Sequence, residues 1–281
     1  MKKIKSLLKT IKSDRLLLAG CIGILILLFI VVAAPLITKY DAKLFGPDVL
    51  AAPGSVGHLL GTNHLGQDIW SMLIYGARTS LMVAVVASFI SGLLGIIIGG
   101  IAGFFGGWVD RIISELINVF LMIPTLFLVL LIVAMFGSSI LNIMIVIGLT
   151  SWPSNAKLMR AQALSLRERT FVKSAQAMGE SKRQILTKYI IPNGVFPVVA
   201  NTTMSMANAI LLEASLSFLG LGDPTVISWG QMIYDGKQYI TSAWWIATFG
   251  GIAICLTLLV FYLTGDGLNH VLNPKHGKAG E

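Results

Sequence analysis

The side chains that could carry out chemistry are few and scattered in this strongly apolar sequence. Serine, histidine and aspartate all occur, but no spacing brings them together as the triad of a hydrolase. No GxxxxGKS or GxxxxGKT loop is present to bind the phosphates of ATP, and no HExxH pair is present to bind zinc. His58 and His64 share one glycine-rich stretch, but two histidines alone are weak grounds for a metal site. We therefore predict no catalytic residue, no resident cofactor and no metal site.

A second group of polar side chains lies within apolar stretches. Asn201, Ser205 and Asn208 fall at i, i+4 and i+7, so they share one face of a helix. Such residues either join neighbouring helices through hydrogen bonds or line a wet pathway, and both interpretations stay open. This helix is the best candidate for a translocation pathway. Glu213 and Asp266 lie near the ends of apolar stretches, where we expect them to face water.

A third group gives the stretch FVKSAQAMGESKRQILTKYIIPN a polar and helical character. Phe171, Ala175 and Met178 fall at i, i+4 and i+7 and predict one apolar stripe along a helix. The small residues Ser174 and Ala177 would let a partner approach this helix closely. The stretch is therefore either a docking element or a solvated amphipathic loop.

Sequence signals also mark where this helix ends and where the next one begins. Gly179 suits the left-handed conformation that often follows the last helical residue. Ser181 can cap a second helix, and Pro192 is expected to stop it, because proline has no N–H to donate. The pattern predicts a helix, a glycine break and a second helix.

The elements that position these groups are predicted to be membrane-spanning helices. Of 281 residues, 55% are apolar and 12% are charged, and apolar segments of the length that a bilayer requires recur along the chain. We predict an all-α polytopic membrane protein with six transmembrane helices, at about residues 16–37, 80–105, 112–136, 138–156, 194–212 and 243–264. The segment GIIIGGIAGFFGGW has no lysine, so we expect its glycines to serve close helix packing.

The positions of the lysines and arginines set the orientation in the membrane. Of the 21 basic residues, 17 fall on one side of the predicted spans, and only Lys39, Lys43, Arg78 and Lys237 fall on the other. By the positive-inside rule, both termini and the loop between the fourth and fifth spans are cytoplasmic. Topology thus explains the net charge of +8, and we predict a lipid bilayer but no nucleic acid as a partner.

We predict three parts along the chain. Residues 1–79 contain the first span and an extracytoplasmic loop, and residues 80–270 contain the other five spans and a cytoplasmic loop at about 157–193. Residues 271–281 form a cytoplasmic tail. In the outer loop, an apolar i, i+3, i+4, i+7 pattern predicts a short, separate amphipathic helix at the membrane surface. This pattern consists of Ile69, Met72, Leu73 and Gly76.

Several ordered motifs resemble one family of membrane proteins. The stretch from Lys173 to Pro192 resembles the EAA loop of ABC importer permeases, EAAxxxG with a later IxLP, and Ala175 and Gly179 occupy matching positions. LGTNHLGQDIWSMLIYGARTSL, EASLSFLGLG, WGQMIYDG and GDGLNHVLNP resemble signatures of the C-type permease of dipeptide, oligopeptide and nickel importers. The resemblance covers nearly the whole chain.

The sequence departs from these motifs at six positions. Lys173 and Ser174 replace the Glu and first Ala of EAA, Tyr189 and Ile191 replace the Ile and Leu of IxLP, and Asn63 and Gln67 replace an Asp and an Arg of the outer signature. A function that depends on the glutamate cannot be carried over to Lys173.

The resemblance implies the type I fold of ABC importer permeases and the cytoplasmic membrane of a bacterium. It also implies a heterodimer with a homologous permease, two cytoplasmic ABC ATPase subunits that bind the ATP, and an extracytoplasmic substrate-binding protein. The residues that would couple to the ATPases are Phe171, Ser174, Ala175, Ala177, Met178, Gly179 and Pro192.

The substrate stays open at this point. Peptides are the first expectation, and nickel or another metal chelate in the same role is the alternative. A stand-alone secondary carrier would be expected to have a mid-membrane carboxylate or an inverted repeat, and neither is evident. A membrane-bound enzyme would need a catalytic constellation, which the sequence also lacks.

Overall fold

The protein was analysed as a computed structural model, which describes residues 14–272. Its elements, in chain order, are α2 (Arg15–Ile37), α3 (Ile69–Phe105), α4 (Gly107–Met122), α5 (Thr125–Phe136), α6 (Ile140–Arg167), α7 (Thr170–Ala177), α8 (Lys182–Ile185), η1 (Leu186–Ile190), α9 (Ile191–Phe218), α10 (Trp229–Lys237) and α11 (Trp245–Leu272). The described part of the chain is therefore all-helical, as predicted. The basic N-terminal segment before residue 14 and the tail after residue 272 lie outside it.

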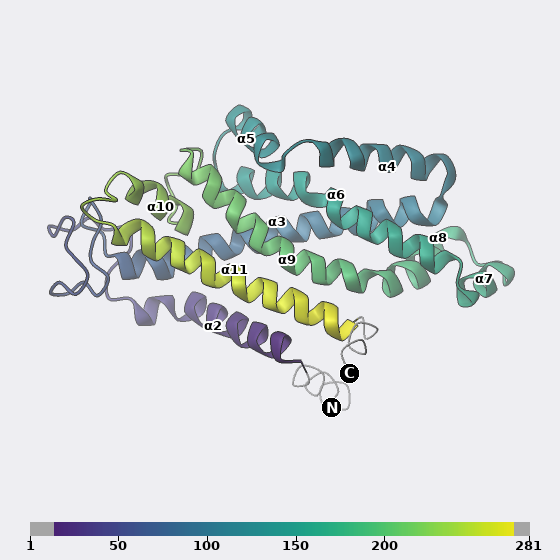
Figure 1. Cartoon of the computed structure of the whole chain (residues 1–281), viewed down its shortest axis with the longest axis horizontal. Coiled ribbons are helices and arrows are strands. Elements are labelled where there is room, and N and C mark those ends of the chain that lie inside the picture. The colour runs from purple at the N-terminus through teal and green to yellow at the C-terminus, as the bar shows by residue number, and fades with distance from the viewer. Residues whose placement is uncertain (1–13, 273–281) are drawn as a thin grey trace.

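The long helices run roughly side by side (Figure 1). The loop before α3 and the short α10 lie at one end of this bundle, and α7 and α8 lie at the other. The start of α2 and the end of α11 point toward the α7 end, and an ion pair between Asp14 and His270, 3.4 Å apart, joins them. The elements predicted on one side of the membrane therefore point toward one end of the molecule.

Among the described residues, four helices are long and apolar enough to cross a membrane, or five if α4 and α5 form one bent span. The four are Arg15–Ile37, Ile69–Phe105, Lys182–Phe218 and Trp245–Val271. The predicted fourth span lies in α6, which is not among them because polar residues from Thr150 to Lys157 lower its hydropathy. α6 is instead the helix against which α3 packs most extensively.

The prediction of a separate amphipathic helix in the outer loop is wrong. Its residues are the first turns of α3, which runs without a break from Ile69 to Phe105. Asp68 caps the start by accepting a hydrogen bond from Ser71 N–H at 2.8 Å. Arg78 lies within this helix, since arginine has a high helix propensity, and its guanidinium donates to the Val31 carbonyl of α2 at 2.9 Å.

The predicted third span is broken rather than continuous. α4 and α5 meet at an angle of 86° across Ile123 and Pro124. Proline disfavours helical geometry in the residue before it, and Ile123 is extended here. The apolar length predicted as one helix therefore forms two.

The glycine-rich segment packs α3 tightly against α6, as predicted. A Cβ added at Gly95, Gly99 or Gly103 would overlap backbone or side-chain atoms of α6. These glycines are four residues apart and form one stripe of the small-residue kind that lets membrane helices approach closely. This contact holds α6, and the polar residues on it, at the centre of the fold.

Candidate functional site

The α7 segment is a short helix held against the end of the bundle and closed by a Schellman motif. Gly179 has a φ of +82°, and its N–H donates to Gln176 O at 3.0 Å. Glu180 N–H donates to Ala175 O at 3.1 Å, which completes the motif. The glycine break predicted from the sequence is confirmed.

The second predicted helix signal is also confirmed, but the stop at Pro192 is wrong. Ser181 and Gln184 form a capping box at the start of α8. The chain then continues through one π-turn, η1, directly into α9, where Pro192 lies at the first turn. Proline does not break the helix here because it directly follows the π-turn, where the hydrogen bonds have already shifted from the usual i−4 partner: Ile191 N–H donates to Leu186 O. Residues 182–218 are thus one continuous helical element.

The apolar residues of α7 face two directions rather than forming one stripe. Ala175 is fully buried, and together with Val172 it packs into a core with Met159, Ile185 and other residues. Met178 and Phe171, by contrast, are 72% and 42% exposed. The predicted stripe of Phe171, Ala175 and Met178 is therefore split. Ala175 anchors the helix, and Phe171, Met178 and the exposed Ser174 and Ala177 lie on its free surface.

The charge at position 173 is neutralised within the loop. Lys173 Nζ lies 3.2 Å from Glu168 Oε2. The Lys173 ammonium, through its hydrogen bond and its charge, holds the pKa of Glu168 below its usual value. Glu180 accepts a hydrogen bond from Tyr189 Oη at 2.7 Å, which lowers the pKa of that carboxyl as well. Both carboxylates are therefore ionised at neutral pH. Because the loop has more basic than acidic residues, it still carries a net positive charge.

A polar groove lies between α6 and α9. Its volume is about 400 Å³, and it has no charged residue in its lining within the described chain. All three predicted pathway residues line it, and they are joined there by Thr150, Ser151 and Ser154 of α6. The structure therefore brings Asn201, Ser205 and Asn208 to one cavity.

Two of these asparagines also join helices through hydrogen bonds, which is one of the two interpretations of the polar face. Asn201 Nδ2 donates to Asn155 Oδ1 at 2.8 Å, and Asn155 Nδ2 donates to Ser91 Oγ at 3.0 Å. This chain of bonds links α9, α6 and α3. At the other end of the groove, Tyr262 Oη donates to Asn208 Oδ1 at 3.2 Å.

Asn155 and the α6 hydroxyls were not among the predicted site residues. The signal was present as the polar run TSWPSNAK, but that run stands at the end of an apolar segment. There it is difficult to distinguish from a loop beginning at the membrane surface. Asn155 is fully buried, which only the packing of α3 and α9 on either side of α6 could reveal.

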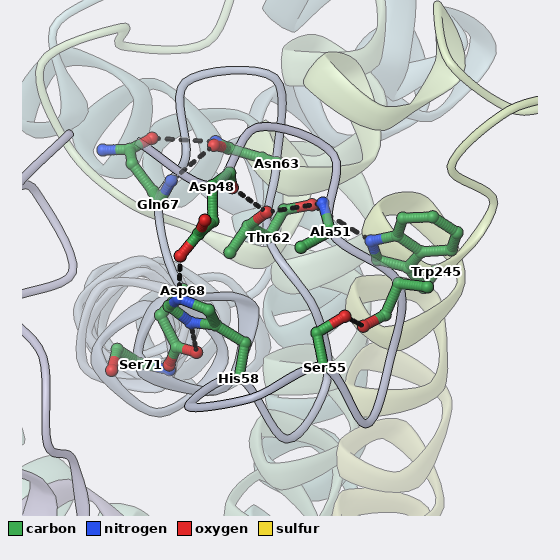
Figure 2. A network of polar contacts seen from close by, with 11 residues as sticks. Asp48, Ala51, Ser55, His58, Thr62, Asn63, Gln67, Asp68, Ser71 and Trp245 are labelled. Carbon is green, nitrogen blue, oxygen red and sulfur yellow. Dashed lines mark hydrogen bonds and ion pairs between the residues drawn. The ribbon is translucent and has the colours of Figure 1, made fainter. Parts of the chain in front are cut away.

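The two histidines of the loop before α3, His58 and His64, contact aromatic and acidic side chains. His58 Nδ1 lies 2.9 Å from Asp68 Oδ1 (Figure 2). The His58 ring also stacks on Tyr40, with ring centroids 4.9 Å apart. His64 stacks on Tyr239 at a centroid distance of 5.0 Å. No group of three or more His, Cys, Asp or Glu residues that could hold a metal occurs in residues 14–272.

The outer loop is also tied to the bundle. Trp245 of α11 donates its indole N–H to Thr62 O at 3.0 Å, and Asn63 donates to Gln67 Oε1 at 2.8 Å (Figure 2). Asn63 and Gln67 are the two residues that depart from the outer signature, and here they bind each other. The loop is therefore held in place by hydrogen bonds to α11 and within itself.

Comparison with protein families places residues 95–278 in the binding-protein-dependent transport system inner membrane component family. The chain is 36% identical over 268 residues to the dipeptide transport system permease protein DppC of Alkalihalophilus pseudofirmus, covering 95% of this chain and 88% of the relative. It is 33% identical to the oligopeptide transport system permease protein OppC of Bacillus subtilis, covering 94% and 87%. The glutathione transport system permease protein GsiD of Pectobacterium atrosepticum is 36% identical, covering 90% and 85%.

A solved structure has the same fold. An inward-facing form of the MetNI methionine ABC transporter aligns with a TM-score of 0.56 at 17% identity, covering 71% of this chain and 96% of that chain. The type I permease fold predicted from the motifs is therefore supported by an independent comparison of shape.

Proposed function

The chain belongs to the family of binding-protein-dependent transport system inner membrane components, and we propose that it is the permease subunit of an ATP-driven peptide importer. The observation that carries this proposal is one continuous helical element, residues 182–218, which begins beside α7 and lines the polar groove further along. A displacement of α7 would thus reach the groove through a rigid connection.

We propose that α7 docks on a cytoplasmic ATPase. Its free surface presents Phe171 and Met178 beside small or short side chains, Ser174 and Ala177, which fits insertion into a groove. Ala175, Gly179 and Pro192 would act indirectly, by fixing the orientation of this surface. Lys173 is paired with Glu168, so we do not assign it the role of the motif glutamate.

We propose that the groove lined by Asn201, Ser205 and Asn208 is part of the translocation pathway. Its lining combines hydroxyl and amide groups with apolar side chains and carries no charge, which suits the backbone amides and varied side chains of peptides of differing sequence. The peptide assignment also rests on the names of the relatives, which are dipeptide, oligopeptide and glutathione permeases. Nickel or a metal chelate is the alternative substrate, and the described residues offer no ligand cluster for a metal.

For the topology, we propose six crossings, with α6 as the one that polar residues make too hydrophilic to pass as a membrane span by composition alone, and with both termini in the cytoplasm. The excess of Lys and Arg on the α7 side supports this orientation. Residues 1–79 would add a helix and the outer loop to a core of residues 80–270, with α3 crossing that boundary, and residues 271–281 would form a cytoplasmic tail.

For the assembly, we propose a heterodimer with a homologous permease, two ATPase subunits and an extracytoplasmic binding protein. The ATPases would bind the ATP, since this chain has no phosphate-binding loop of the GxxxxGKS or GxxxxGKT form. ATP binding would draw the α7 helices together and turn the groove outward, and hydrolysis would return it inward. This is a rigid-body switch between two states.

Cysteine accessibility tests the pathway. With Cys21 and Cys255 replaced by serine and alanine, Ser205→Cys is expected to react with a charged, water-soluble methanethiosulfonate at least about tenfold faster than Ser88→Cys. Ser88 is a matched control because it is a serine on α3 that is only 1% exposed. Adding ATP, binding protein and a peptide should change the rate at Ser205→Cys. Equal, slow reaction at both positions would show that the groove is not part of an aqueous pathway.

A further inference from the structure

The start of α10 is wedged between α3 and α9 at the outer end of the bundle. Trp229 N–H donates to Ser80 Oγ at 3.1 Å, and its indole N–H donates to Leu73 O at 2.9 Å, so α10 is held to α3. On the other side, a Cβ at Gly230 would lie 2.7 Å from Ala214 Cα, so α10 also touches the backbone of α9. Glycine at position 230 is required by this close approach.

A buried carboxylate lies at the centre of this contact. Glu213 of α9 is 1% exposed, which corrects the expectation that it faces water, whereas Asp266 is exposed as expected. Glu213 Oε1 accepts hydrogen bonds from Ser217 Oγ at 2.9 Å and from Ser228 Oγ at 2.8 Å. Its Oε2 has no partner among the residues that the structure describes.

The two serines bind the same oxygen but connect different elements. Ser217 lies on α9 itself, four residues after Glu213, so its bond stays within one helix. Ser228 is the N-cap of α10 and also accepts Gln231 N–H at 3.0 Å. The Ser228 bond therefore joins the start of α10 to α9.

Stability alone is a poor reason for a carboxylate at this position. A buried carboxyl group with one oxygen that has no partner costs free energy, and an apolar side chain of similar volume would avoid that cost. A strong, directed bond between two elements is what the carboxylate provides that an apolar side chain cannot. The helical element that contains Glu213, residues 182–218, begins beside α7 at the opposite end of the molecule.

We propose that Glu213 is a positioning residue that makes α10 move with α9, so that the outer mouth of the groove follows the α7 loop during the transport cycle. This inference rests on the proposed function. Leu212 and Ser215, the neighbours of Glu213 on α9, line the groove, so the contact lies beside the part that would open. Loss of the bond would let α9 move while α10 stayed behind.

The test is the amount of peptide imported per ATP hydrolysed by the complete transporter in proteoliposomes. Ser228→Gly removes the bridging hydroxyl and keeps an acceptable N-cap, and it should lower this ratio at least about fivefold. Glu213→Ala should act in the same direction. Glu213→Gln should stay within about twofold of the unchanged transporter, because its amide oxygen can still accept both hydroxyls. Ser217→Ala should also stay within about twofold, because its bond does not leave α9.

If Glu213→Ala does not assemble, the import ratio of Ser228→Gly still tests whether Glu213 couples α10 to α9. An unchanged ratio in Ser228→Gly, or an equal loss in Ser217→Ala, would overturn the proposal. A merely structural role would lower the yield of assembled complex and leave the ratio unaltered, which would overturn it as well. Failure of the proposed function gives a different result: the transporter without any substitution would then not import peptide when ATP is added.

Discussion

Replacing Met178 by lysine is expected to lower substrate-stimulated ATP hydrolysis of the assembled transporter at least about tenfold. Met178 is 72% exposed in the isolated chain, so the change should not disturb the fold. A lysine near the C-terminus of a helix is also electrostatically favourable. In the docked complex, however, its ammonium would be buried against an ATPase surface without a dedicated partner, which is costly.

The measurement is ATP hydrolysis with and without binding protein and peptide, together with the amount of ATPase that co-purifies. Ser165→Lys is the matched control, since it adds the same charge at an exposed position of α6. Phe171→Ala should act in the same direction as Met178→Lys. Normal stimulation in Met178→Lys, with ATPases bound, would refute the assignment of this surface. Ala175→Arg would be a poor test, because Ala175 is fully buried and its replacement would disrupt the packing of α7.

Substitution of Gly99 is expected to destabilise the fold strongly. A Cβ at this position would overlap the backbone carbonyl oxygen of Ala156, and a backbone atom cannot rotate away as the end of a side chain can. Such overpacking typically costs about 1–3 kcal/mol, which exceeds the gain of about 0.5–1 kcal/mol from replacing a helical glycine by alanine. Gly99→Ala should therefore lower the melting temperature, and Gly99→Leu should abolish assembled protein.

The neighbouring glycine gives the control. At Gly100 the nearest atoms to an added Cβ are side-chain ends of Ile191 and Met159, both at 3.7 Å. Gly100→Ala should therefore leave the melting temperature unchanged or raise it. Thermal unfolding of the purified proteins in detergent checks both variants. Equal melting temperatures for Gly99→Ala and Gly100→Ala would contradict the account of the α3–α6 contact.

Local signals in the sequence were reliable where the physics is local. Gly179 and Ser181 mark the end of α7 and the start of α8, because a left-handed glycine and a capping serine act on the adjacent turn alone. The glycine stripe of α3 was also predictable, since a run of glycines in an apolar segment has few other uses in a membrane.

Signals that depend on a partner element were less reliable. Apolar residues occur on two sides of α7, and the period alone does not say that Val172 and Ala175 face the protein while Met178 faces outward. Prolines show the same difficulty. Pro35, Pro153 and Pro197 lie inside helices, whereas Pro124 separates two, because neighbouring groups decide whether a break is tolerated.

The polar site was predicted only in part for the same reason. The face formed by Asn201, Ser205 and Asn208 could be identified from helical spacing. That α6 supplies the opposite wall, and that Asn155 joins the helices behind it, follows from the α3–α6 packing and from no local pattern. Glu213 was misplaced because its burial depends on α10 folding back over the end of α9.

Capture of the intact protein from its membrane shows whether this chain works as a permease driven by cytoplasmic ATPases. The tagged chain would be solubilised from its native membrane in mild detergent, purified in one step and analysed by mass spectrometry. We expect a homologous permease and ATP-binding subunits to co-purify with the chain, and the complex to hydrolyse ATP. A chain that is purified alone, and that moves peptide in proteoliposomes without ATP, would contradict the account.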